Sequence, residues 1–137
     1  MLDSTHRIVA GVVLLTVVGI AYGGTFLLRV VRGQVPANPL QKSFFRAGHA
    51  HAGVLVILGL LVMVLVQSNG VTGPWSWLSG GVLIAAILLP AGFFLSVVGR
   101  DPQQPNRLIV LVWIGAAVLT VGLLAAGVGL IVAGAGD

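Results

Sequence analysis

The chain has 137 residues, of which 58% are hydrophobic and only 7% are charged, whereas a typical soluble domain is about 25% charged. This composition excludes a soluble enzyme, a disordered tail and a nucleic-acid-binding domain, and it predicts an all-α integral membrane protein. Seven Lys and Arg residues punctuate the apolar runs instead of clustering on a polar face, so we expect no nucleic acid as a partner. Cysteine is absent, which excludes disulfides, thiolate nucleophiles and iron–sulfur clusters.

Long stretches without charge predict four membrane-spanning helices in a single transmembrane domain over residues 1–137. A helix needs about 20 apolar residues to cross the hydrocarbon core. The second and third spans are separated by the segment Gln67–Pro74, which is dense in helix breakers. Pro90 lies within the third span, where it should kink the helix and free a carbonyl group. We therefore expect a four-helix bundle with helices at 6–31, 45–67, 75–98 and 107–133.

The distribution of positive charge predicts the orientation in the membrane. The two loops that follow the first and third helices lie on the same side and, with the adjoining helix ends, carry most of the cations, whereas the other side has only Arg7. Cytoplasmic loops are enriched in Lys and Arg, so we expect both termini outside in a multi-pass protein of the bacterial inner (plasma) membrane, surrounded by lipid. The cations of the cytoplasmic side are Arg29, Arg32, Lys42, Arg46, Arg100 and Arg107.

Small residues recur at helical spacing in three of the predicted helices. Apolar lipid tails give little hydrophobic drive for helices to associate, so close backbone approach at small residues matters. These stripes predict tight helix packing, and they are compatible with a homo-oligomer or with a place in a larger membrane complex. The stripes are Gly115, Gly122 and Gly129 in the fourth helix, Gly48, Ala52 and Gly59 in the second, and Gly11, Gly19 and Gly23 in the first.

The candidate chemistry lies at Arg46, His49 and His51, near the cytoplasmic end of the second helix. No Asp or Glu falls inside a predicted span, so paired-carboxylate catalysis, a di-iron carboxylate site and a Ser-His-Asp arrangement lack their acids. Positions i and i+2 diverge by about 200° around a helix, so His49 and His51 are not expected to chelate one ion together. His49 shares its side with Ala52 and with other small residues, which favours it as the inward histidine.

Three interpretations of the histidines remain open. In the first, His49 or His51 is the axial metal ligand of a heme b, with Arg29 and Arg46 pairing with its propionates. In the second, His49 and His51 have an acid–base or substrate-binding role. In the third, the histidines are interfacial residues or interhelical hydrogen-bond donors of an accessory subunit, and the cations only set topology and contact lipid headgroups.

The segment from His49 to Gly59, His-Ala-His-Ala-Gly-Val-Leu-Val-Ile-Leu-Gly, resembles the second helix of the large subunits of heme–copper oxidases and nitric oxide reductases. It is also similar to small bacterial four-helix membrane proteins with a His-x-His at this place, in which the first helix ends like Tyr22–Arg29. The oxidase resemblance implies one heme-ligand position, His49 or His51, and a redox-associated function. The second axial histidine and the copper ligands of those subunits have no counterpart here, so oxygen reduction does not carry over.

A second resemblance rests on Asn38-Pro39 followed by His49, His51 and Gly53. This order is similar to that of hydroxylaminobenzene mutases, which are also small multi-helix membrane proteins. The resemblance implies isomerisation of an arylhydroxylamine, with a histidine as general acid and base and a cation such as Arg46 assisting.

Overall fold

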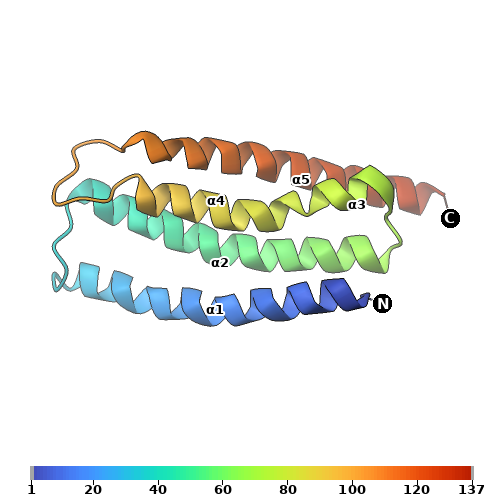
Figure 1. Ribbon diagram of the computed structural model, residues 1–137, viewed down its shortest axis with the longest axis horizontal. Helices are drawn as coiled ribbons and strands as arrows, with labels where there is room; N and C mark the ends of the chain where they lie inside the picture. The colour runs from blue at the N-terminus through green and yellow to red at the C-terminus, as the bar shows by residue number, and fades with distance from the viewer. Residues whose placement is uncertain (1, 137) are drawn as a thin grey trace.

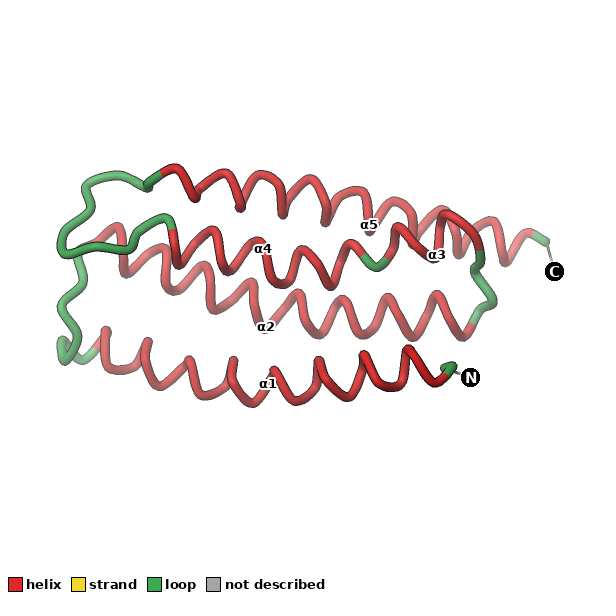
Figure 2. The backbone as a smooth tube through the Cα atoms, in the orientation of Figure 1, coloured by secondary structure: helices red, strands yellow, loops and turns green. Residues whose placement is uncertain are grey.

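The computed structural model describes residues 2–136, and within that range the secondary structure is entirely helical (Figure 2). Four segments, Ser4–Val31, Pro39–Ser68, Gly73–Leu95 and Arg107–Ala135, are long and apolar enough to cross a membrane. The prediction of an all-α chain with four candidate spans is therefore confirmed. The helices are α1 (Ser4–Val31), α2 (Pro39–Ser68), α3 (Gly73–Ser79), α4 (Gly81–Leu95) and α5 (Val110–Ala135), with one 3₁₀ turn, η1 (Arg107–Ile109), before α5.

The four long helices lie side by side in the order α1, α2, α4, α5 (Figure 1). The two chain ends lie at one end of the bundle, and the α1–α2 and α4–α5 loops lie at the other. The row does not close on itself, because α1 approaches α2 alone among the described helices. The bundle is thus more open at α1 than the glycine stripes of the sequence predict.

Helix α2 begins at Pro39, nearly two turns before the predicted start at 45. Asn38 caps it by a reciprocal pair of hydrogen bonds. The Gln41 backbone N–H donates to Asn38 Oδ1 at 2.9 Å, and the Asn38 backbone N–H donates to Gln41 Oε1 at 3.1 Å. Proline suits the first helical position because its missing N–H has no partner there anyway. This capping box extends the helix back through Lys42, which the predicted start at 45 leaves in the loop.

The third span is interrupted at Gly80, which separates α3 from α4. Helix α4 continues through Pro90, whose missing N–H deprives the Ala86 carbonyl of its helical partner. It ends at Leu95, earlier than the predicted 98, because Asn106 binds the last turn. The Asn106 side-chain Nδ2 donates to the Leu95 carbonyl at 2.9 Å, and its backbone N–H donates to the Ser96 carbonyl at 2.7 Å.

Glycines bring α4 into close contact with both of its neighbours. The α5 stripe is confirmed, since Gly115, Gly122 and Gly129 are all buried. A Cβ on Gly122 would lie 2.9 Å from the Val82 backbone nitrogen. On α4 itself, a Cβ on Gly92 would lie 2.6 Å from the Val112 backbone nitrogen. These distances are too short for any side chain, so α4 and α5 meet at their backbones.

The glycine stripe of α2 packs against a neighbouring helix, whereas that of α1 does not. In α2, Gly48 and Gly59 are buried against side chains of α4, as expected. In α1, a Cβ on Gly11 or Gly19 would meet no atom within 4 Å, and one on Gly23 would meet only the His49 ring. The expected packing stripe of α1 is therefore wrong. Without a backbone contact of this kind, α1 is held only by longer side chains against α2 and the core beyond it.

The outer surface is apolar along the length of the helices. Large hydrophobic side chains such as Leu15, Ile57 and Ile131 are exposed on three different helices. An apolar surface of this extent is unusual for a soluble monomer and suits a hydrocarbon environment. Trp77 is 82% exposed in α3, and Trp113 is 73% exposed near the start of α5. Exposed indoles near opposite ends of the bundle are typical of the two membrane–water interfaces.

Replacing Gly122 by Ala should destabilise the fold by about 1–3 kcal/mol, because the added methyl meets backbone that cannot move aside. Thermal unfolding of the detergent-purified protein measures the effect. Gly127→Ala is the matched control on the same helix, since a Cβ there meets no atom within 4 Å. Equal melting temperatures for the two variants would contradict the close approach of α4 and α5.

Candidate functional site

His49 lies in the third turn of α2 with its half-buried ring against α1. A Cβ on Gly24 would lie 3.5 Å from His49 Nε2, and one on Gly23 would lie 3.8 Å from His49 Nδ1. The nitrogen-bearing edge of the ring is thus directed at a pair of glycines. The hydrogen bonds among residues 2–136 include none to this imidazole. The ring is only half-buried, and the described chain has no fully buried side-chain nitrogen or oxygen without a partner, so the His49 nitrogens are accessible to a ligand.

The His49 ring opens onto a groove between α1, α2 and α4. Its volume is about 480 Å³, within the range of small-molecule and cofactor sites. Its polar members are few, since the Thr16 hydroxyl already donates to the Val13 carbonyl at 2.6 Å. The groove is therefore an apolar space with one histidine. It is lined by Thr16, Gly19, Ile20, Gly23, Phe26, His49, Ala52 and Phe94.

His51 lies on another side of α2 and contacts α4. Its Nδ1 is 2.7 Å from the Ala47 carbonyl oxygen, and its ring centroid is 5.1 Å from that of Phe93. Because a carbonyl oxygen only accepts, Nδ1 carries the proton in this contact and Nε2 keeps its lone pair. His49 and His51 are therefore directed at different helices, as the helical spacing predicts, and they do not share a site.

Arg46 lies one turn before His49 and is exposed at the loop end of α2. With Lys42 and three apolar residues at the end of α1, it lines a smaller hollow of about 190 Å³. Its Nε donates to the Lys42 carbonyl at 3.3 Å. Within residues 2–136, the one ion pair lies at the opposite end of the bundle, so no carboxylate neutralises Arg46 or Lys42. Arg29 is exposed in the last turn of α1 and does not line this hollow.

Asn38 serves to join the two loops at this end of the bundle. Its Nδ2 donates to Asp101 Oδ1 at 2.8 Å and to the Pro102 carbonyl at 2.7 Å. Its capping partner Gln41 is buried and donates to the Val97 and Gly99 carbonyls at 3.1 and 3.0 Å. Asn38 is also about 16 Å along the helix axis from His49. In this structure the Asn-Pro pair thus caps and ties the fold, away from the histidine.

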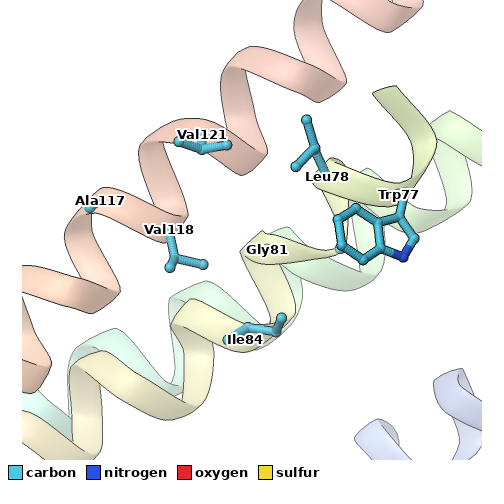
Figure 3. A pocket seen from close by; sticks show the side chains of 8 residues that line it. Trp77, Leu78, Gly81, Ile84, Ala117, Val118 and Val121 are labelled. Carbon is cyan, nitrogen blue, oxygen red and sulfur yellow. The ribbon is translucent and has the colours of Figure 1, made fainter. Parts of the chain in front are cut away.

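A separate hollow of about 460 Å³ lies on the outside of the bundle, where α3 and α4 meet α5 (Figure 3). Figure 3 shows Trp77 and Ile84 along one wall and Val118 and Val121 along the other. The break at Gly80 opens this space. No titratable side chain lines it, so it offers lipid contact and no chemistry. Its lining is Trp77, Leu78, Gly80, Gly81, Ile84, Ala117, Val118 and Val121.

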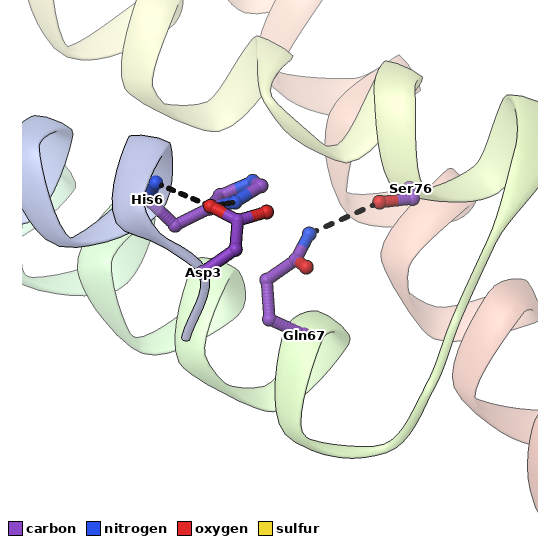
Figure 4. A network of polar contacts seen from close by, with 4 residues as sticks. All are labelled: Asp3, His6, Gln67 and Ser76. Carbon is purple, nitrogen blue, oxygen red and sulfur yellow. Dashed lines mark hydrogen bonds and ion pairs between the residues drawn. The ribbon is translucent and has the colours of Figure 1, made fainter. Parts of the chain in front are cut away.

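The fold also assembles polar residues that sequence reasoning left unconnected, at the end where the chain termini lie. Asp3, His6, Gln67 and Ser76 come together there from α1, α2 and α3 (Figure 4). The His6 backbone N–H donates to Asp3 Oδ1 at 2.8 Å, and this hydrogen bond lowers the pKa of the Asp3 carboxyl below its usual value. Asp3 caps α1 in this way. Only tertiary structure brings the Asp3–His6 pair to the Gln67–Ser76 pair, because the two pairs are far apart in the sequence.

The comparisons with known proteins add no family to this description. No protein-family model, no curated protein and no solved structure matches the chain.

Replacing Gln41 by Leu should lower the free energy of unfolding by about 1–3 kcal/mol, because two loop carbonyls lose a donor and the capping box is broken. Thermal unfolding in detergent measures this loss. Gln34→Leu is the control, since Gln34 is exposed in the same loop region and its side chain makes no hydrogen bond in the described chain. A Gln41→Leu variant as stable as the control would show that the two loops do not depend on this link.

Proposed function

We propose that the protein is a membrane-embedded heme-binding protein with a redox-associated function, and that His49 is the axial ligand. The observation that carries the proposal is the His49 imidazole, which faces an apolar groove of about 480 Å³ and has no hydrogen-bond partner in residues 2–136. Heme needs one strong protein ligand and an otherwise apolar pocket. This groove supplies both.

The residues around His49 fit a flat macrocycle if α1 moves outward. The nitrogen edge of the ring now lies close to Gly24, so the iron needs more room between the ring and α1. Helix α1 approaches α2 alone and has glycines at 19, 23 and 24. Moving it would draw Val13, Val17 and Ile20 away from the core, but it displaces no large side chain at the glycine positions. When bound, heme would supply one-electron chemistry, while the protein holds it and excludes water.

The propionates would be held by cations at the membrane surface. Arg46 lies one turn from His49 and shares a hollow with Lys42, and neither has a carboxylate partner in the described chain. Charge-assisted hydrogen bonds of this kind are among the stronger polar contacts. Arg29 lies at the same end of the bundle, outside that hollow, and would contribute to the positive potential around the propionates.

His51 is the second candidate for the axial ligand. Histidines that bind metals usually donate their other ring N–H to a carbonyl or carboxylate, and His51 Nδ1 makes such a contact with the Ala47 carbonyl. His49 remains our first choice because it lines the groove, which His51 does not.

A cofactor-free isomerase acting on an arylhydroxylamine is the second candidate function. The observation that favours it is the pair of aromatic rings, Phe26 and Phe94, that line the groove with His49. Aromatic rings stack on or meet an aryl group edge to face. In this reaction His49 would move the proton as general acid and base, and Arg46 would assist from the preceding turn.

We also propose that the end with the two loops is cytoplasmic, so that both chain termini lie outside. The loop end carries Arg29, Arg32, Lys42, Arg46, Arg100 and Arg107, whereas Arg7 lies at the other end. This asymmetry follows the positive-inside rule and supports an inner (plasma) membrane location.

The heme proposal predicts a Soret band that shifts when the protein, produced with ample heme and purified in detergent, is reduced with dithionite. His49→Ala should lose most of this absorbance, because the iron loses its protein ligand. His6→Ala is the matched control, since His6 is in the first turn of α1, at the opposite end of the bundle. Absorption spectra of the oxidised and reduced proteins measure the effect.

Two results would overturn this assignment. Loss of the band in His51→Ala, with the band retained in His49→Ala, would move the ligand to His51. A featureless spectrum of the wild-type protein would reject heme. Conversion of an arylhydroxylamine to an aminophenol by the colourless protein, abolished in His49→Ala, would then favour the isomerase.

The orientation proposal can be tested with single cysteines, because the natural chain contains none. In intact cells a membrane-impermeant maleimide should label Asn69→Cys, in the α2–α3 turn, and should leave Gln104→Cys, in the α4–α5 loop, unlabelled. Both residues are exposed, so both should be labelled after the cells are lysed. The opposite pattern in intact cells would reverse the proposed topology.

A further inference from the structure

The end of the bundle opposite His49 contains a second, polar hollow of about 170 Å³. His6 of α1, Gln67 of α2 and Ser76 of α3 line it, together with apolar residues. Figure 4 shows the Gln67 side chain between the His6–Asp3 pair on one side and Ser76 on the other. Three helices therefore direct hydrogen-bonding groups into one small space.

Two polar atoms in this hollow remain available. His6 Nδ1 lies 2.9 Å from Asp3 Oδ1, and in this contact Nδ1 carries the proton. His6 Nε2 is then left as a hydrogen-bond acceptor. Gln67 Nε2 donates to Ser76 Oγ at 3.2 Å. Gln67 Oε1 is then left as an acceptor, and the Ser76 hydroxyl hydrogen is left as a donor. Neither His6 Nε2 nor Gln67 Oε1 has a hydrogen-bond partner in residues 2–136. The hollow thus offers both acceptors and a donor to a ligand.

The polar hollow continues into an apolar groove along α1. Val9 and Leu83 line both the polar hollow and a larger space of about 430 Å³ between α1 and α4. That space extends along α1 to Ile20, a length of about 16 Å by the rise of the helix. Along this length its walls are almost entirely Val, Ile, Leu and Ala side chains. The shape is that of a long apolar channel with a polar end.

We propose that this channel binds a neutral lipid with a single long apolar chain, whose hydroxyl or carbonyl head lies in the polar hollow at His6, Gln67 and Ser76. The apolar chain lies between α1 and α4 along Val9 and Ile20. A neutral head is favoured because the Asp3 carboxylate contacts His6 and opposes an anionic phosphate, and no Lys or Arg lines the hollow. The cations are concentrated at the other end of the bundle.

The head group must supply the selectivity of this site. An apolar chain that moves from the bilayer into the channel gains little, because both surroundings are apolar. The hydrogen bonds to His6 and Gln67 distinguish the ligand from bulk lipid, since each is made by an atom that has no other partner among the described residues. Single substitutions of residues in the polar hollow should therefore weaken binding more than small substitutions of the residues that line the apolar channel.

Monooleoylglycerol is the probe, and native mass spectrometry of the detergent-purified full chain measures its binding. We expect one bound molecule per chain. Gln67→Ala should weaken binding about threefold to tenfold through loss of a hydrogen bond. Val9→Trp should weaken it by at least about tenfold, because the indole fills the passage between hollow and channel. Ile8→Trp is the matched control, since Ile8 is 67% exposed and lines neither space.

Equal binding by Val9→Trp and Ile8→Trp would overturn the proposed position of the chain. Displacement of the monooleoylglycerol by an equal amount of phosphatidylglycerol would overturn the neutral head group. Unchanged binding in Gln67→Ala would overturn the role of the polar hollow. The channel shares Thr16, Ile20 and Ala52 with the groove at His49, but the head-group residues His6, Gln67 and Ser76 line only the polar hollow. The effect of Gln67→Ala on lipid binding therefore tests this proposal separately from the heme spectrum.

Discussion

The close approach of α4 to α2 and α5 is the constraint on which the rest of the structure depends. In lipid, helices associate through packing and hydrogen bonds, because apolar side chains gain little by leaving apolar surroundings. Gly92, Gly115 and Gly122 remove the side chains that would keep α4 and α5 apart, and Gly48 and Gly59 do the same between α2 and α4. These three helices form the closely packed part of the molecule, with α4 in the middle.

The position of α1 follows from its lack of such contacts. Its glycines meet open space or a histidine ring, so it approaches only α2 and leaves gaps on the side of α4. Both candidate ligand sites lie along these gaps, one near His49 and the other near His6. Helix α1 makes few close contacts with the packed helices α2, α4 and α5, and this leaves space for ligands. The space leaves no backbone N–H or carbonyl group without a partner, because each helix keeps its own hydrogen bonds.

Much of the fold could be predicted from the sequence, because charge-free length marks the spans and regular glycine spacing marks the α5 interface. The divergence of His49 and His51 also followed from helical geometry alone. The start of α2 at Pro39 was missed because the capping box of Asn38 and Gln41 lies beyond the apolar run. The break at Gly80 was missed because a helix was expected to continue through an apolar segment, with Pro90 as the point of distortion.

The candidate sites were less predictable than the helices, since they depend on which faces meet. His49 stood out as a polar residue in an apolar span, whereas His6 and Gln67 were near the ends of their helices and looked like ordinary surface residues. The glycines of α1 recur at helical intervals, as the packing glycines of α5 do. Only the neighbouring helix decides whether such a stripe forms a contact or borders a gap.

The gap between α1 and α4 has a consequence for how any occupant is measured. It opens on the side of the bundle where apolar residues are exposed, so in the membrane-embedded protein that we propose its contents would exchange with the bilayer and not with the aqueous phase. Occupancy then follows the mole fraction of a molecule among the surrounding lipids, whatever its concentration in water. Detergent dilutes those lipids, so each washing step during purification lowers the occupancy of a weakly held molecule even if the protein itself is unchanged.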